Sequence, residues 1–219
     1  MIPGAPLRID FVSDFTCPWC AIGLRALEQA IARLGKEVTV ELHLQPFELN
    51  PAMAHEGEPI ADYVARKHGA GAAELAARQA LIRQRAAAAG FTFATRTHVY
   101  NTFDAHRLLH WAGLQGRSLD LKRVLLAAYH CRGENPASHE VLMRAVGEVG
   151  LSVESALQAL ASGAYADEVK ASVRRWQQLG IDSVPSVVVD DHTLIQGGQP
   201  VEVYERALRH IARAARAAA

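Results

Sequence analysis

Two cysteines separated by two residues are the most reactive pair in this sequence. The tetrapeptide Cys17-Pro18-Trp19-Cys20 follows a short apolar run and precedes a segment with helical periodicity. A helix N-terminus presents free amide N–H groups and the positive end of the helix dipole, which together stabilise an anion. A thiolate at Cys17 would gain this stabilisation, and one helical turn would bring Cys20 beneath it. The expected chemistry is attack of Cys17 on a substrate disulfide, followed by attack of Cys20 on the mixed disulfide.

The residues around this pair agree with exchange chemistry. Pro18 has no N–H to leave unpaired in the first helical turn, and Trp19 offers an apolar surface beside Cys17. A zinc site is the main alternative, but a structural zinc site usually needs a second pair of ligands of this kind. The third cysteine, Cys131, ends an apolar helical segment, where such a residue is most often a small buried hydrophobe. We therefore predict no metal.

An acidic residue precedes the motif. Asp14 lies three positions before Cys17, near the end of the first expected strand. Its carboxylate could accept a proton from Cys20, tune Cys17, or cap the helix that follows. Capping is favoured, because Asp is a preferred residue at helix N-termini.

A second motif, Val184-Pro185, opens an apolar and β-branched segment near the C-terminus. A proline in a strand belongs at the first residue or at an edge, because it lacks a donor for the ladder. An X-Pro bond adopts the cis form at a cost of only about 0.5–1 kcal/mol. A cis bond would expose the backbone of Val184 to an extended substrate segment beside Cys17, whereas a trans bond would leave an ordinary edge proline. Together with the cysteine pair, the motif favours cis.

Composition excludes several classes of function. Half of the 219 residues are hydrophobic, so a large core can form without disulfides or metals. The 23 basic residues balance the 23 acidic ones, and no basic stripe indicates binding to nucleic acid. No window approaches the roughly 18 apolar residues of a membrane span, and Met1 to Asp14 does not resemble a signal peptide. We predict a cytoplasmic protein, and in a reducing compartment a close cysteine pair is more often active than structural.

The periodicity predicts a divided α/β domain. Strands are expected at 7–12, 38–44, 184–189 and 193–195, and helices at 21–34, 72–89, 101–114, 118–130, 138–149, 165–179 and 201–212. Strand signals vanish between about Pro59 and Gly163, a block too long for a loop in a compact domain. We predict one α/β domain made of residues 1–58 and 164–219, interrupted by a helical domain at 59–163.

Several blocks spread over nearly the whole chain resemble the DsbA family, in particular its FrnE-like branch. They are Asp14 to Cys20 with Ile22-Gly23, Gln45 to Pro51, Asn101-Thr102 with Ala105 to Leu108, Val184 to Ser186, and Gln196 to Pro200. The resemblance implies a thioredoxin-like fold with a large all-helical insertion that covers the active-site face. It also implies that Cys17 is the nucleophile, Cys20 the resolving thiol and Pro185 a cis proline.

The resemblance extends the set of expected substrate-binding residues. The expected substrate-binding residues beside the thiols are Pro18, Trp19, Val184 and Pro185. The resemblance alone adds Asn101 and His106 to this set. Some FrnE-like proteins carry a second cysteine pair in the insertion; this chain has only Cys131 there, so a relay between two disulfides is not expected.

Two enzymatic functions and one binding function remain open at this point. The first is a protein-disulfide oxidoreductase or isomerase that acts on protein or small-molecule disulfides, with no bound cofactor beyond its own dithiol. The second is a glutathione-dependent isomerase or transferase, because the superfamily includes 2-hydroxychromene-2-carboxylate isomerases and kappa-class glutathione transferases. Those relatives commonly have serine in place of Cys17, so two retained cysteines favour redox exchange. The third is a binding module or chaperone. Relatives are often dimers, so the resemblance also implies a homodimer.

Overall fold

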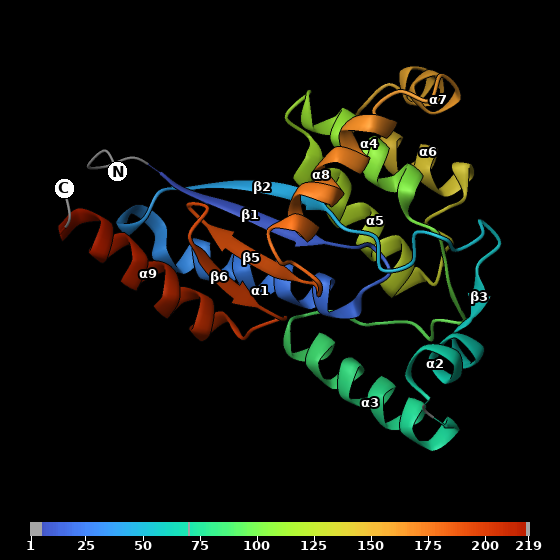
Figure 1. Ribbon diagram of the computed structural model, residues 1–219, viewed down its shortest axis with the longest axis horizontal. Helices are drawn as coiled ribbons and strands as arrows, with labels where there is room; N and C mark the ends of the chain where they lie inside the picture. Colours follow the sequence, from blue (N-terminus) through green and yellow to red (C-terminus); the bar gives the residue numbers. More distant parts are fainter. Residues whose placement is uncertain (1–5, 70, 218–219) are drawn as a thin grey trace.

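The computed structural model describes residues 6–69 and 71–217 and is built around one mixed sheet (Figure 1). The strand order is β2-β1-β5-β6, with β1 and β2 parallel and the other neighbours antiparallel. The strands are β1 (Leu7–Ser13), β2 (Val40–Pro46), β5 (Ser186–Val189) and β6 (Thr193–Gln196). A crossover through α1 (Pro18–Leu34) and the short 3₁₀ turn Gly35–Glu37 joins β1 to β2, as a parallel pair requires.

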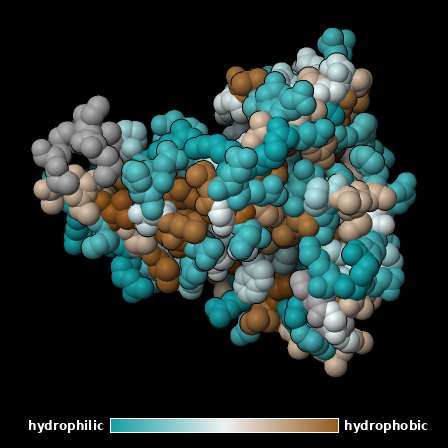
Figure 2. Space-filling model, in the orientation of Figure 1, coloured by the Kyte–Doolittle hydropathy of each residue, from teal (hydrophilic) through white to brown (hydrophobic). Residues whose placement is uncertain are grey.

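Helices cover both faces of the sheet. Successive side chains of each strand point to opposite faces. Phe11 and Val187 point into the core shared with α1 and with α9 (Val201–Ala217). Val12 and Val188 instead contact Trp176 of α8 (Ala166–Gln178) on the opposite face. The α8 helix covers only part of this face, and Figure 2 shows hydrophobic side chains gathered over the strands beyond it. The central strand β1 is therefore covered on both sides, and each of its residues except Arg8 is buried.

The segment between β2 and β5 is helical, as predicted. Besides α8 it contains α2 (Ile60–His68), α3 (Ala72–Ala88), α4 (Phe103–Gly113), α5 (Ser118–Arg132), α6 (His139–Glu148) and α7 (Val153–Ala161). The thioredoxin-like α/β architecture with a helical insertion is confirmed. Figure 1 shows α4 to α7 at one end of the sheet and α2 and α3 apart from them, below α1.

The expectation of a segment without strands was wrong. Two-residue strands, β3 (Glu58–Pro59) and β4 (His98–Val99), form an antiparallel ribbon. Strands this short have no period to recognise. The nine-residue helices α2 and α7 were not predicted either, because each spans fewer than three turns. Within the residues that the structure describes, no helix combines the length and hydropathy needed to cross a membrane.

The first turns of α1 meet the loop after β6 at two glycines. A methyl group on Gly23 would lie 3.1 Å from the Cα of Gly198 and 3.2 Å from Cγ of Pro185. One on Gly198 would lie 2.8 Å from the carbonyl oxygen of Trp19. The helix that carries both cysteines and the loop beside Pro185 are thus in contact through their backbones.

This contact predicts that Gly198→Ala lowers the free energy of unfolding by about 1–3 kcal/mol, because the added methyl group would overlap a backbone oxygen that cannot move aside alone. Equilibrium unfolding in urea measures the change. Gly113→Ala in α4 is the matched control, since its methyl group would meet nothing closer than Cβ of Ser118 at 3.8 Å. The control should be neutral or slightly stabilising, as Ala is in a helix. Equal stability of Gly198→Ala and the native protein would contradict the packing described.

Candidate active site

Cys17 stands at the N-terminus of α1. It is the N-cap residue, with extended backbone, and Pro18 begins the helix. Its thiol is 5% exposed by residue and donates a hydrogen bond to the carbonyl oxygen of Val184, with 3.5 Å between sulfur and oxygen. The Val184–Pro185 peptide bond is cis. The nucleophile expected from the sequence therefore lies where free helix amides stabilise an anion, and directly opposite the residue before Pro185.

Cys20 lies one turn further along α1 and is completely buried. Its backbone N–H donates to the carbonyl oxygen of Cys17 over 3.1 Å. Burial raises the pKa of the Cys20 thiol well above its ordinary value, and a hydrogen bond with Cys17 raises it further. Cys20 is therefore a protonated thiol at neutral pH, held in contact with Cys17 and shielded from solvent.

Asp14 lies beneath this helix turn as a fully buried carboxylate. Oδ1 accepts from the N–H of Phe15 at 2.6 Å, and Oδ2 from the N–H of Leu49 at 2.8 Å and the hydroxyl of Thr16 at 3.4 Å. Burial alone would raise the pKa of Asp14, but hydrogen bonds, led by one from His106, hold it below its ordinary value. Asp14 is thus ionised. The expected capping role is wrong, because these donors lie outside α1, whose N-cap is Cys17.

His106 and Asn101 support the chain around the site. His106 is buried, and its Nε2 lies 3.0 Å from the carbonyl oxygen of Phe47 and 3.5 Å from Oδ1 of Asp14, so Nε2 carries the proton. Burial lowers the pKa of His106, which leaves the ring neutral. The amide of Asn101 donates to the carbonyl oxygen of Met53 at 3.0 Å and accepts from the N–H of the first α4 residue at 2.9 Å.

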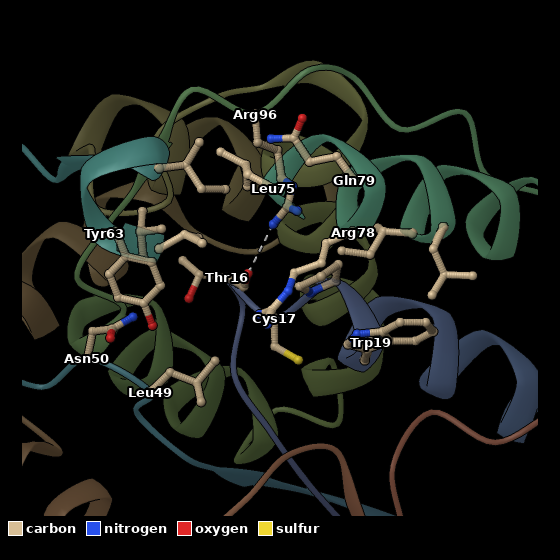
Figure 3. A pocket seen from close by; sticks show the side chains of 16 residues that line it. Thr16, Cys17, Trp19, Leu49, Asn50, Tyr63, Leu75, Arg78, Gln79 and Arg96 are labelled. Carbon is tan, nitrogen blue, oxygen red and sulfur yellow. Dashed lines mark hydrogen bonds between the residues drawn. The ribbon is translucent and has the colours of Figure 1, made fainter. Parts of the chain in front are cut away.

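A cavity of about 410 Å³ opens beside Cys17 (Figure 3). Its walls come from the active-site turn, the segment after β2, α2, α3, the segment before β4 and the end of β4. The lining residues are Thr16, Cys17, Pro18, Trp19, Leu49, Asn50, Ile60, Tyr63, Val64, Leu75, Arg78, Gln79, Leu81, Ile82, Arg96 and Val99. The structure thus brings Pro18 and Trp19 to the cavity with Cys17. It places Asn101 and His106 outside the lining, where they hold the segment after β2 against α4.

Most of the lining is apolar, and its charged side chains are both arginines. Arg96 donates to the carbonyl oxygen of Thr16 over 3.5 Å, the bond drawn in Figure 3, and lies 5.8 Å from the ring centroid of Tyr129. Arg78 pairs with Glu74 on the outer side at 2.6 Å. The lining contains no Asp or Glu, so the charged side chains that line the cavity are positive.

A buried lysine of α5, Lys122, packs against the active-site turn and was not predicted from the sequence. The residue is completely buried, and Nζ lies 3.7 Å from the centroid of the Phe15 ring with no hydrogen-bond partner among the described residues. Burial lowers the pKa of Lys122 to about 8, although the charges of Cys20, Asp14 and Cys17 act in the opposite direction. One signal was present in the sequence. Lys122 precedes Leu126 and Tyr129 by four and seven residues, so it shares their buried face.

The remaining candidates take structural positions. Cys131 is partly exposed and packs against the core, and burial raises the pKa of its thiol. Trp111, Trp176 and Tyr129 are buried in the core. In the described ranges, no three His, Cys, Asp or Glu side chains come close enough to form a metal site.

Comparison with known proteins identifies the family. Residues 8–209 match the model of the DSBA-like thioredoxin domain. The chain belongs to this family. A solved structure described as a probable DsbA oxidoreductase, SCO1869 from Streptomyces coelicolor, is 33% identical, with a TM-score of 0.89 over 95% of this chain and 90% of that one.

Two more distant structures share the fold. A 2-hydroxychromene-2-carboxylate isomerase is 14% identical, with a TM-score of 0.72 over 97% of this chain and 99% of that one. The cytosolic disulfide reductase DsbM from Pseudomonas aeruginosa, solved with GSH, is 16% identical, with a TM-score of 0.61 over 95% and 98% of the two chains. The DSBA-like family and the isomerase are relatives that the sequence resemblance led us to expect.

The different surroundings of the two thiols predict selective alkylation. Iodoacetamide at pH 7 should modify Cys17 of the reduced protein and leave Cys20 unmodified, because Cys20 is fully buried and its pKa is raised. Peptide mass analysis at successive times measures both rates, and protein unfolded in guanidinium is the control in which the two react alike. Equal rates in the folded protein would contradict the assignment of Cys20 as the buried partner.

The buried lysine predicts a pH-dependent stability difference. The fall of the Lys122 pKa from 10.5 to about 8 corresponds to a penalty on the order of 3 kcal/mol at pH 7. Between pH 8 and 10.5 the unfolded chain binds more protons than the folded one, so stability rises with pH through this window. Lys122→Met should therefore have a larger free energy of unfolding than the native protein at pH 7. The difference between the two proteins should become smaller as the pH rises towards 10. Urea unfolding of both proteins at several pH values measures this difference. A difference that does not change with pH would contradict the prediction.

Proposed function

We propose that this DSBA-like protein catalyses thiol–disulfide exchange, with Cys17 as nucleophile and Cys20 as resolving thiol. The observation that carries the proposal is the position of the Cys17 sulfur. It lies at the N-terminus of α1, lines an open cavity, faces the carbonyl oxygen of Val184 at 3.5 Å, and has the Cys20 thiol in hydrogen-bond contact behind it.

The geometry supports a sequence of two exchanges. A substrate disulfide enters the cavity, and the Cys17 thiolate attacks one of its sulfurs while the other sulfur leaves as a thiolate. Cys20 then attacks the Cys17 sulfur, so that the Cys17–Cys20 disulfide forms and the second substrate thiolate leaves. Val184 offers its carbonyl oxygen at the point of attack, where an extended substrate segment could pair with the backbone. The reverse order of steps reduces the protein and oxidises a dithiol.

The proposal includes no resident cofactor, since the dithiol itself carries the two electrons. Protein disulfides and small disulfides are both substrates in this proposal, and glutathione serves as a co-substrate. A cytoplasmic location and a homodimer stay predictions from the sequence.

The cavity supports one alternative, a glutathione-dependent isomerase or transferase that acts on a small organic molecule. Two guanidinium groups in a mostly apolar lining suit a small thiol that carries carboxylates. The fold is shared with an isomerase and with a disulfide reductase solved with GSH.

Equilibrium titration with reduced and oxidised glutathione tests the proposal and separates it from the alternative. Oxidation of Cys17 and Cys20, scored by alkylation and mass, should follow one reversible two-electron transition. A midpoint near −270 mV would indicate a reductant, and one near −120 mV an oxidant. Cys20→Ser should accumulate a Cys17–glutathione mixed disulfide, since no resolving thiol remains.

Cys17→Ser should abolish exchange, whereas Cys131→Ser, the matched control, should leave it unchanged. Under the alternative, Cys17→Ser would instead retain turnover of a small organic substrate with glutathione. Absence of any reversible couple in the native protein would exclude the redox function.

A further inference from the structure

The cavity beside Cys17 combines an apolar interior with very few charged groups, and this composition narrows the class of disulfide that it suits. Its volume of about 410 Å³ is that of a site for one small molecule. A substrate that fills this space places apolar atoms against aliphatic side chains from α2, α3 and β4. These side chains belong to Ile60, Val64, Leu75, Ile82 and Val99.

One of the two arginines in the lining, Arg78, already has a carboxylate partner. Its Nε and Nη2 both donate to Oε1 of Glu74, one helical turn earlier in α3, over 3.1 and 2.6 Å. Both side chains of this pair are about half exposed, so water screens the charge further. An anionic substrate would have to compete with Glu74 for this guanidinium.

The other arginine, Arg96, is half-buried and forms no ion pair within the ranges that the structure describes. Its Nη1 donates to the neutral carbonyl oxygen of Thr16 over 3.5 Å, and its guanidinium carbon lies 5.8 Å from the ring centroid of Tyr129. That ring is itself buried and fixed, because the hydroxyl of Tyr129 donates to the carbonyl oxygen of His98 over 2.9 Å. Arg96 is therefore a held guanidinium whose charge is not matched by a carboxylate.

The guanidinium of Arg96 also lies near the reacting sulfur. Figure 3 shows it pointing toward the turn that contains Thr16 and Cys17. These two residues are adjacent, and consecutive Cα atoms are only about 3.8 Å apart. One small molecule can therefore reach both the sulfur of Cys17 and the guanidinium when its anionic group lies a few bonds from its disulfide.

We propose that Arg96 binds a carboxylate of the substrate, and that the preferred substrate is a small disulfide with an apolar body and a carboxylate near its sulfur. This inference rests on the proposed exchange at Cys17. The planar fork of a guanidinium matches the two oxygens of a carboxylate, and the ring of Tyr129 limits the orientations of that fork. Glutathione disulfide carries the same charged group on a polar peptide body, which suits the apolar wall less well.

The bound disulfide then enters the exchange already described. The Cys17 thiolate attacks one sulfur, the bond between Cys17 and that half of the substrate forms, and the substrate S–S bond breaks. The other half leaves as a thiolate with the electron pair, and Cys20 resolves the mixed disulfide. Arg96 takes no electrons or protons in these steps and acts by holding the carboxylate.

Three disulfides test the inference on the reduced native protein. They are the disulfide of mercaptobenzoic acid, its neutral carboxamide analogue of the same shape, and glutathione disulfide. Loss of the free Cys17 thiol, measured by alkylation and mass in quenched samples, gives each rate, and division by the rate with dithiothreitol removes intrinsic reactivity. The normalised rate for the aromatic acid should exceed the rates for the amide and for glutathione disulfide by about tenfold or more.

Substitution of the arginine assigns the effect to one side chain. Arg96→Met removes the guanidinium, so the ratio of the acid rate to the amide rate should fall to near unity while the amide rate stays close to native. Arg174→Met, at an exposed arginine of α8 outside the cavity lining, loses the same charge and should keep the native ratio. The amide rate shows that each variant keeps a working Cys17, and the ratio of the native protein stands without any variant.

The outcomes separate this inference from the function on which it rests. A native ratio of acid to amide near unity, or a faster reaction with glutathione disulfide than with the aromatic acid, would overturn the inference and leave exchange at Cys17 intact. Loss of the ratio in Arg78→Met in place of Arg96→Met, or equal slowing of acid and amide in Arg96→Met, would overturn the role of Arg96. No reaction of native Cys17 with any of the three disulfides would overturn the proposed function as well.

Discussion

An ionised carboxylate lies beneath the first turn of α1, where the chain itself must replace the water that would otherwise surround the charge. Burying a charge without such partners costs several kcal/mol. The donors to Asp14 come from its own turn, from Leu49 after β2, and from His106 on α4. Three separate parts of the chain therefore meet at one side chain. The sheet and the helical segment have to dock before this charge is accommodated, so the environment of the thiols is a product of tertiary structure and not of the cysteine motif alone.

The helical segment also contributes what the strands and α1 lack. It forms most of the wall of the cavity, brings Arg96 to the active-site turn, and delivers Lys122 to the interior. Phe15 connects these contributions, since its ring contacts both Lys122 and His106 while its backbone belongs to the turn before Cys17. A buried amine without a hydrogen-bond partner reduces stability.

The parts of this site that depend on local sequence were predictable. The strand-to-helix transition placed the two cysteines at a helix N-terminus, and the Val184-Pro185 motif at the start of a strand lies beside them as expected. The role of Asp14 was not predictable, because its partners Leu49 and His106 are distant in sequence. Asn101 and His106 were expected in the groove from resemblance alone, but their polar atoms are engaged with the segment after β2. Lys122 lay on an apolar helix face, yet only docking of α5 against the turn at Phe15 shows what it meets.

The ribbon of β3 and β4 has a consequence for how such proteins diversify. It holds the two ends of the α2–α3 segment together, and the N–H of Ile60 donates to the carbonyl oxygen of Thr97 over 2.9 Å. The α2–α3 segment therefore begins and ends at the same place, the β3–β4 ribbon. Between these two ends it forms one wall of the cavity. Because the entropy of closing a loop grows only slowly with its length, a segment anchored in this way tolerates insertions and exchanges. Selectivity for substrates can thus evolve within residues 60–97 while the buried groups around Cys20 remain undisturbed.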